Sequence, residues 1–379
     1  MAEALLSFLP AARTSHPAIE SDAGFALGWD HARYGLVPPP EHMVAGNPLR
    51  QGWEAGRAAF GRRTRESNPN ARRWLQLRLT AWLQGRHFEA LTVTPNFLGQ
   101  IDSILCPVTR EALDGPQAGV VARVCEDAGY AAGNLAVLGQ RAAAAKAGLD
   151  FEEAVRLAEQ AHRGEPSAAT RAAVQPELTA PQWARLAVLL SFVTPLPHAR
   201  AASLPLLVLP PNRLRVLNPI QGLQTLVTLL LAKSGWSQRL PKLEALLPSA
   251  AARRELRAFF MVYMPRVIAG GRPDDAAAWR RALEDAWRHP LVQSHWKRFA
   301  LQLDAQSSQA VLEQAIEAGL MTQRVQLHTE EQATEGWSLE TRGYTEKRAT
   351  PRRRLAARPT VAPPQLPAAC APQQLAMEF

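Results

Sequence analysis

The stretch from Trp183 to Met321 constrains the fold most, because its apolar residues recur at helical spacing and prolines divide it into segments. One segment starts with Asn218 and Pro219, a cap and a first-turn residue, and its leucines return every three or four positions. The same spacing continues at Trp279, Leu283, Trp287 and Leu291. Tryptophans at this spacing are typical of a packed core, so the sequence predicts a helical domain over residues 176–325.

Residues 119–148 break this helical pattern. The letters GVVARVC and NLAVL are β-prone, EDAGYAAG between them is turn-forming, and QRAAAAKA after them favours a helix. This order predicts two short strands followed by a helix, a ββα unit. Further helices are expected over residues 71–85, at TPNFLGQID, and after Asp150, which forms a capping box with Glu153. The fold class is therefore α+β and predominantly helical.

Changes in composition and helix-breaking segments divide the chain into four parts. Residues 22–66 hold two Gly-Trp pairs around a proline-rich turn, and we expect a small aromatic module packed through its tryptophans. Residues 70–165 hold the ββα unit with its flanking helices, and residues 176–325 hold the helical domain. Residues 326–379 lack apolar periodicity and are rich in Arg, Pro, Ala and Gln, which predicts a disordered basic tail.

The charge balance favours an anionic partner. The 379 residues include 43 Lys and Arg against 34 Asp and Glu, a formal net charge of +9, which favours nucleic acid or another acidic surface. The three cysteines form no CxxC pair, the start lacks a basic secretion-signal region, and no apolar run reaches the roughly 20 residues of a membrane helix. We expect a cytoplasmic protein without membrane contact, with a composition rich in Ala, Arg and Leu that is typical of bacteria.

Residues 100–165 resemble the HNH branch of the His-Me finger endonucleases, in which a ββα finger holds one divalent metal against the scissile phosphate. The resemblance spans under a fifth of the chain. It implies that an asparagine fixes the loop between the strands and that a lysine lies on the finger helix. The framework positions kept in this sequence are Gly129, Tyr130, Asn134, Leu135 and Lys146.

The chemical positions of that family are mostly replaced. The metal-binding carboxylate and the general base fall on Ala122 and Arg123, and the metal ligand of the helix falls on Ala143. Arginine stays protonated at neutral pH, so Arg123 cannot act as a general base. These departures predict no catalytic residue, no bound metal and no cofactor. The four positions of the family's zinc-binding cysteines are Cys106, Thr109, Gly139 and Ala142, of which only the first is a cysteine.

Positive charge nevertheless remains on the finger and in two basic tracts. Residues 50–78 carry eight arginines against two glutamates, and residues 342–358 carry seven basic residues against one acid. Such tracts bind phosphates by counterion release, although a basic tail is equally often a solvated tail without a specific partner. The sequence therefore predicts a nucleic-acid-associated protein, with DNA as partner ahead of RNA and without nuclease turnover. The residues expected to contact phosphates are Arg123, Arg141 and Lys146 on the finger, and Arg62 and Arg63 in the first tract.

Three alternatives stay open. The stretch around Asn134 can be an ordinary α/β loop unrelated to nucleases. The chain can be a scaffold whose helical domain binds a protein partner, which is favoured if the three basic finger residues do not share an exposed surface. It can also be an active nuclease that uses Mg²⁺ and displaced ligands, although an Asp-His pair between aromatic residues is typically structural. The candidate ligands are Asp30, His31, Glu126 and Asp127.

Overall fold

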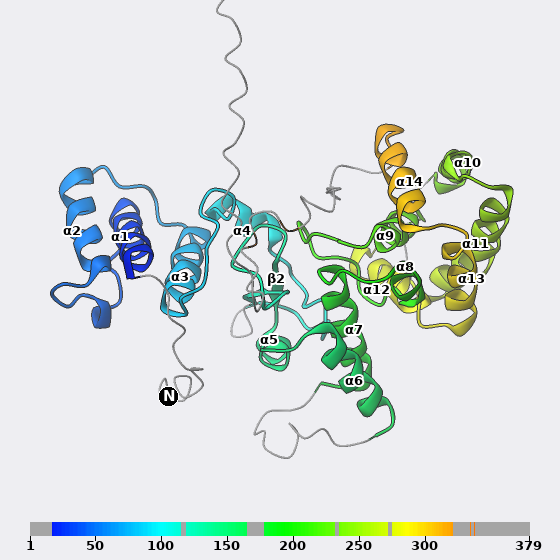
Figure 1. The fold of residues 1–379 in the computed structure, drawn as a ribbon, viewed down its shortest axis with the longest axis horizontal. Helices are drawn as coiled ribbons and strands as arrows, with labels where there is room; N and C mark the ends of the chain where they lie inside the picture. Colours follow the sequence, from blue (N-terminus) through cyan, green and yellow to red (C-terminus); the bar gives the residue numbers. More distant parts are fainter. Residues whose placement is uncertain are drawn as a thin grey trace, which may run out of the picture. The chain divides into compact units, whose positions relative to one another are not determined.

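The computed structural model describes residues 17–114, 119–164, 178–231, 235–271 and 275–320, together with Thr334 and Trp337. Within these residues the chain forms fourteen α-helices and one two-stranded antiparallel sheet (Figure 1). The expected class, α+β and mostly helical, is confirmed at that level. Contacts group Met1–Leu339 into one compact unit, so the predicted boundaries near residues 66–70 and 165–176 fall inside it. The predicted tail over residues 326–379 lies outside the described residues, apart from Thr334 and Trp337.

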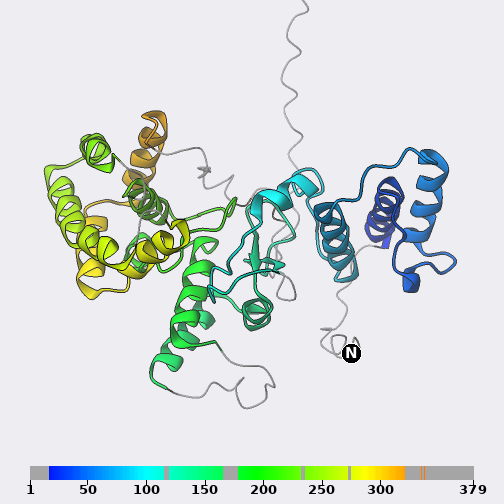
Figure 2. The ribbon, with the colours of Figure 1, turned by 180° about the vertical axis from the view of Figure 1, so that it is seen from behind.

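The N-terminal part is a pair of helices, α1 (Pro17–Arg33) and α2 (Pro48–Phe60), joined by a segment that includes one 3₁₀ turn at Pro40–His42. Figures 1 and 2 show the two helices side by side. Their closest approach is made by glycines. A Cβ atom on Gly28 would lie 1.9 Å from the Leu49 carbonyl oxygen, and one on Gly52 would lie 1.9 Å from the Phe25 carbonyl oxygen.

The tryptophans of this pair also make contacts within the predicted module. Trp29 contacts Phe60 edge-on with ring centroids 5.1 Å apart, and the Trp53 indole N–H donates to the Leu36 carbonyl at 2.9 Å. The α1–α2 pair therefore combines close backbone contacts at its glycines with one aromatic contact between the helices.

Two helices follow at the expected places, α3 (Pro69–Leu83) and α4 (Pro95–Ile101). Each begins with a proline preceded by a capping side chain. Asn68 Oδ1 accepts from the Ala71 N–H at 2.8 Å, and Thr94 Oγ1 accepts from the Phe97 N–H at 3.2 Å. Capping of this kind satisfies N–H groups that have no partner within the helix.

The sheet consists of β1 (Val120–Arg123) and β2 (Leu135–Leu138), and α5 (Gln140–Lys146) follows. In the antiparallel register Val120 is opposite Leu138 and Arg123 is opposite Leu135. All four residues of β2 are buried, which is unusual for a two-stranded sheet, since such sheets commonly expose one face.

The two faces of this hairpin pack into two different hydrophobic cores. On one face Val121, Leu135 and Val137 join the core formed with α1–α4. On the other face Ala136 and Leu138 join the core of the helices that follow. The hairpin is therefore buried on both sides, and this placement decides where its polar side chains can go.

The remaining helices form the larger core. The proline-rich stretch between α8 and α9 has no regular element. A helix break at His289 and Pro290 interrupts the spacing that ran from Trp287 to Leu291, so Trp287 is fully buried whereas Leu291 is 53% exposed. The helices are α6 (Phe151–His162), α7 (Ala180–Phe192), α8 (His198–Ser203), α9 (Pro219–Leu231), α10 (Trp236–Leu246), α11 (Ala250–Gly270), α12 (Ala276–Ala286), α13 (Pro290–Ala300) and α14 (Ala305–Glu317). None of the helices in the described part is both long and apolar enough to cross a membrane.

Candidate functional site

The loop between β1 and β2 is organised around Asn134, which is fully buried. Its Oδ1 accepts from the Cys125 N–H at 2.7 Å, and its Nδ2 donates to the carbonyl oxygens of Cys125 at 3.0 Å and Gly129 at 3.1 Å. The Asn134 carbonyl also accepts from the Val124 N–H at 2.7 Å. The Asn134 side chain therefore bonds backbone groups at Cys125 and Gly129 and holds the loop in shape, which is a structural role.

An ion-pair network lies beside this loop, with two buried cations around the carboxylate of Glu126, which is 29% exposed. Glu126 receives the Lys146 ammonium on Oε1 and the Arg123 guanidinium on Oε2, the latter at 2.7 Å. Arg123 Nη1 also donates to the carbonyl oxygens of Glu126 at 2.7 Å and Ala128 at 2.9 Å. The Lys146 side chain is 1% exposed and that of Arg123 is 9% exposed. Both cations therefore bind oxygen atoms of the protein itself.

Burial controls the electrostatics of this network. Desolvation lowers the pKa of Lys146, and the Glu126 carboxylate acts against that shift. Desolvation also raises the pKa of the neighbouring Cys125 thiol, which reduces the fraction of reactive thiolate at neutral pH. Cys125 is therefore not an activated thiol, and Glu126 holds Lys146 in its charged form.

The other framework positions also pack inward. Leu135 is fully buried, and Tyr130 is stacked on Phe88 with ring centroids 6.3 Å apart. The Gly129 N–H donates to the Trp337 carbonyl at 2.6 Å, and the Trp337 indole N–H donates to Ala132. Trp337 is itself fully buried, so a residue from far along the chain closes the loop.

The three basic finger residues do not share an exposed surface. Arg141 is 29% exposed and donates to Glu111 Oε1 at 2.8 Å, whereas Arg123 and Lys146 point into the Glu126 network. The predicted phosphate contacts of Arg123 and Lys146 conflict with this geometry, because neither side chain reaches the surface while Glu126 holds it. The burial of Lys146 was missed because an Ala-rich helix with one lysine is typical of a solvated helix.

Three of the four positions that the resemblance aligns with zinc-binding cysteines lie close together. The Thr109 N–H donates to Cys106 Sγ at 3.4 Å, and a Cβ on Gly139 would lie 3.8 Å from the same sulfur. Ala142 is buried in the same core as Cys106. Of the four side chains only that of Cys106 is a usual zinc ligand, so these positions do not form a tetrahedral site.

The side chains that the nuclease alternative needs as metal ligands are bonded to other groups of the protein. The Asp30 carboxylate pairs with Arg78, and His31 is buried with Nδ1 bonded to the Leu27 carbonyl at 3.0 Å. Glu126 is held by Lys146 and Arg123 as described above. Across the described residues, no group of three or more His, Cys, Asp and Glu side chains is placed to hold a metal ion.

The environment of His31 predicts a stability change in mild acid. Desolvation lowers the pKa of His31 below its ordinary value of about 6.5, so the unfolded chain binds a proton more readily than the folded one. Stability is then lost as the pH falls from about 6.5 through the folded-state pKa. We expect the His31→Gln variant to show a shallower pH dependence between about pH 5 and 7 in denaturant titrations.

The control for this measurement is His162→Gln, at an exposed position on α6. It should retain the steeper pH dependence of the unmodified protein. Equal slopes for the two variants would mean that His31 does not carry the acid sensitivity.

An exposed basic surface lies between α2 and α3. Its backbone is held by hydrogen bonds from the Arg63 N–H to Phe60 and from the Arg65 N–H to Arg33, both at 2.8 Å. Between residues 57 and 72 the one acid is Glu66. We call this the α2–α3 arginine surface; it comprises the exposed Arg57, Arg62, Arg63, Arg65 and Arg72. Within the part of the chain that the structure describes, none of these five arginines forms an ion pair.

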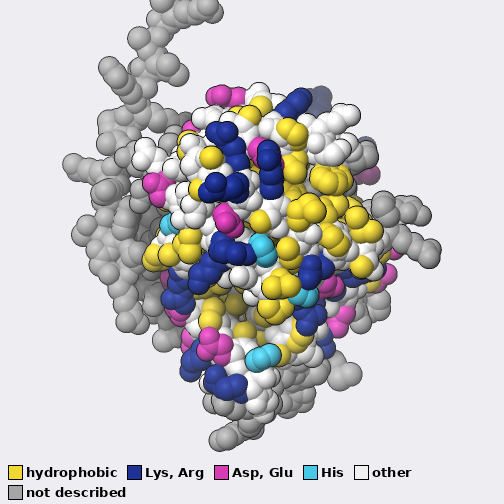
Figure 3. Space-filling view, turned by 90° about the vertical axis from the view of Figure 1, so that its right-hand side faces the viewer, with side chains coloured by type: hydrophobic (Ala, Val, Ile, Leu, Met, Phe, Trp, Pro, Cys, Tyr) yellow, Lys and Arg dark blue, Asp and Glu magenta, His cyan; other side chains and the backbone are white. Residues whose placement is uncertain are grey.

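A second exposed surface, with both charged and hydrophobic side chains, lies on the side of α10, α11 and α13. Figure 3 shows arginine and lysine side chains beside hydrophobic ones there. On α11, Met261 is 77% and Ile268 is 63% exposed. Arg253 and Arg254 are exposed on the same helix. Exposed apolar residues beside charges are common at protein contacts, so this face bears on the scaffold alternative.

Comparison with known proteins identified no similar protein. No family model matches the chain, and neither the curated proteins nor the solved structures include a significant match.

Proposed function

We propose that the protein associates with nucleic acid through the α2–α3 arginine surface, and that the β1–β2 hairpin with α5 is a structural unit without nuclease turnover. The observation that carries the proposal is a set of exposed arginines on an ordered loop without acidic partners in the described chain. Cations in this state are free to contact phosphates, and the release of counterions then favours binding. We propose duplex DNA as the partner ahead of RNA.

An aromatic side chain supports the arginine surface. The Arg57 guanidinium lies over the Trp53 ring, 4.9 Å from its centroid. Such a contact orients the cation without neutralising its charge. The surface thus combines fixed positive charge with a neighbouring aromatic ring, a combination that is typical of nucleic-acid contacts.

The test is a salt titration of binding to a labelled DNA duplex, followed by fluorescence anisotropy. The variant is the triple substitution Arg62→Gln, Arg63→Gln and Arg65→Gln. Each lost phosphate contact should reduce the slope of log affinity against log salt by about 0.9, so we expect a reduction of about 2 to 3. At moderate salt the affinity should fall by about 10-fold or more.

The control triple removes the same net charge from exposed positions elsewhere: Arg156→Gln, Arg254→Gln and Arg281→Gln. It should retain most of the salt slope. If both triples bind alike, or if the unmodified protein shows no salt-sensitive binding to DNA or RNA, the proposal fails. The scaffold alternative, favoured by the burial of Arg123 and Lys146 and by the α11 face, then becomes the better explanation.

A further inference from the structure

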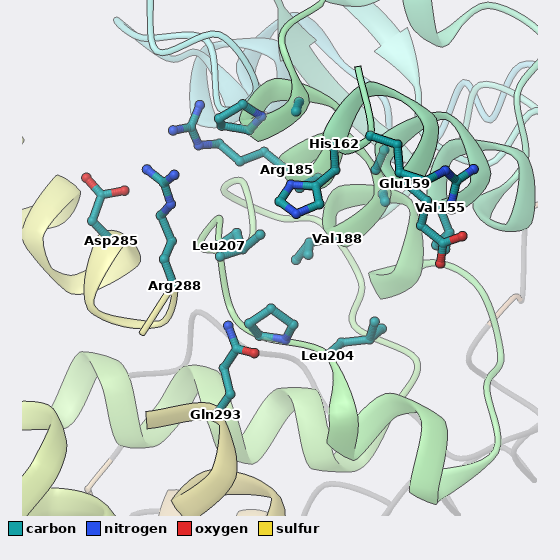
Figure 4. Close-up of a pocket in the computed structure, with 17 residues that line it drawn as sticks. Val155, Glu159, His162, Arg185, Val188, Leu204, Leu207, Asp285, Arg288 and Gln293 are labelled. Carbon is teal, nitrogen blue, oxygen red and sulfur yellow. The ribbon is translucent and has the colours of Figure 1, made fainter. Parts of the chain in front are cut away.

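A pocket of about 550 Å³ lies between α6, α7, the segment after α8, and the α12–α13 corner (Figure 4). Its volume is within the range of roughly 300–1,000 Å³ that is usual for small-molecule sites. Most of its wall is apolar, with Val155 from α6, Val188 from α7, and Leu204 and Leu207 from the segment after α8. None of these residues belongs to the α2–α3 arginine surface, so the pocket is independent of the proposed function.

Two arginines lie at one end of this pocket. In Figure 4 the side chains of Arg185 and Arg288 lie near Asp285, whereas His162 lies in the middle of the pocket and Glu159 at the other end. Arg185 is 9% exposed and donates one described hydrogen bond, to the Val108 carbonyl at 3.1 Å. A guanidinium carries five N–H donors. A nine-tenths buried cation therefore lines the pocket with most of its donors unused by the described residues.

Arg288 adds a second cation that is not neutralised. Its side chain is exposed, and within the described chain it forms neither a hydrogen bond nor an ion pair. The acids nearby are already used, since Arg110 pairs with Asp285 at 2.8 Å and with Glu284 at 3.0 Å. Desolvation, followed by repulsion from Arg110, lowers the pKa of Arg185. This end of the pocket thus has positive charge that an anion would stabilise.

The lining also limits the kind of anion. Among the described residues that line the pocket there is no Phe, Tyr or Trp, and the one aromatic ring is the imidazole of His162, so the pocket offers a nucleobase little stacking surface. The carboxylate of Asp285 at the arginine end disfavours ligands with several negative charges. A single carboxylate on an aliphatic body matches both the apolar wall and the paired guanidinium groups, since arginine binds carboxylates in a two-pronged geometry.

We propose that this pocket binds a small amphipathic carboxylate, with its aliphatic chain against Val188, Leu204 and Leu207 and its carboxylate on Arg185 and Arg288. The probe is decanoate, titrated calorimetrically into the full chain below the concentration at which the probe forms micelles. We expect saturable binding at one site. Decanol, which has the same chain without the charge, and acetate, which has the charge without the chain, should both bind more weakly.

Two variants test the position of the site. Arg288→Gln alters an exposed side chain and should weaken decanoate binding by about 10-fold or more. Ala184→Phe adds a ring on the α7 side of the pocket and should abolish binding. Arg281→Gln, an exposed arginine of α12 that does not line the pocket, is the matched control and should bind as the unmodified protein does.

Three results would overturn the proposal. They are the absence of saturable decanoate binding, equal binding of decanol and decanoate, and an affinity of Arg288→Gln equal to that of Arg281→Gln. Because Arg288→Gln lies at the surface, its result stands even if Ala184→Phe fails to fold. DNA binding through the α2–α3 arginine surface should be unchanged in Arg288→Gln, so failure of one proposal can be told from failure of the other.

Discussion

Replacing Glu126 with glutamine should lower the free energy of unfolding by about 3 kcal/mol at pH 7. The substitution keeps the shape of the side chain but leaves the Lys146 ammonium, 1% exposed, without its counter-charge. Arg123 loses the same partner. Removing one member of a buried ion pair is costly because the remaining charge stays desolvated. Denaturant titration followed by circular dichroism measures the change.

Lys146→Met is the matched control for this prediction. It removes the buried charge and leaves Glu126 paired with Arg123, so the change should be below about 1 kcal/mol. If Glu126→Gln and Lys146→Met destabilise the protein equally, the network is not the source of the effect.

The stability of the Glu126→Gln variant should depend on pH through the titration of Lys146. Desolvation lowers the pKa of Lys146, and Glu126 raises it, so loss of the carboxylate lowers the pKa of Lys146 further. A lowered folded-state pKa means that stability rises as the pH approaches about 10.4, the value of the unfolded chain. The stability gap between Glu126→Gln and the unmodified protein should therefore narrow as the pH rises from 7 to about 10.

Gly52→Ala should destabilise the α1–α2 pair by about 3 kcal/mol. On helix propensity alone this change would stabilise α2 by about 0.5 to 1 kcal/mol. The added Cβ, however, would lie 1.9 Å from the Phe25 carbonyl oxygen, and this is a backbone atom that cannot rotate away. The two helices must separate, and the packing between them is lost. Denaturant titration followed by tryptophan fluorescence detects this, since Trp29 and Trp53 lie in the pair.

Ala26→Val serves as the control for Gly52→Ala. It adds methyl groups to α1 at an exposed position and should cost only the small difference in helix propensity. A stabilised Gly52→Ala variant would show that the helices do not approach as closely as the structure indicates.

Local chemistry made several elements predictable. Thr94 and Asp150 each cap a helix start where the sequence predicts one, and such caps depend on neighbouring residues that can be read directly. Asn68 caps α3 just ahead of the start predicted at residue 71. The alternation of β-prone and turn-forming letters likewise located β1 and β2. The glycine contact between α1 and α2 also has a sequence pattern, because glycines four residues apart, as at Gly52 and Gly56, lie on one face of a helix.

The candidate sites depended on contacts that no local pattern contains. Lys146 is buried because Glu126, 20 residues away along the chain, supplies its counter-charge. The decanoate pocket brings Val155 near Arg288 and Gln293, more than a hundred positions further on. Long-range packing of this kind decides whether a basic side chain faces a ligand or the interior, and sequence spacing does not report it.

The hairpin that is buried on both faces has a consequence for how the chain loses its structure. Val137 belongs to one core and its neighbour Ala136 to the other, so neither core can melt without exposing a face of β2. The two cores should therefore unfold in a single cooperative transition rather than one after the other. Shortening the chain at residue 165, a boundary that sequence composition favours, would leave the Ala136 face uncovered and would remove a shared support rather than a separable domain.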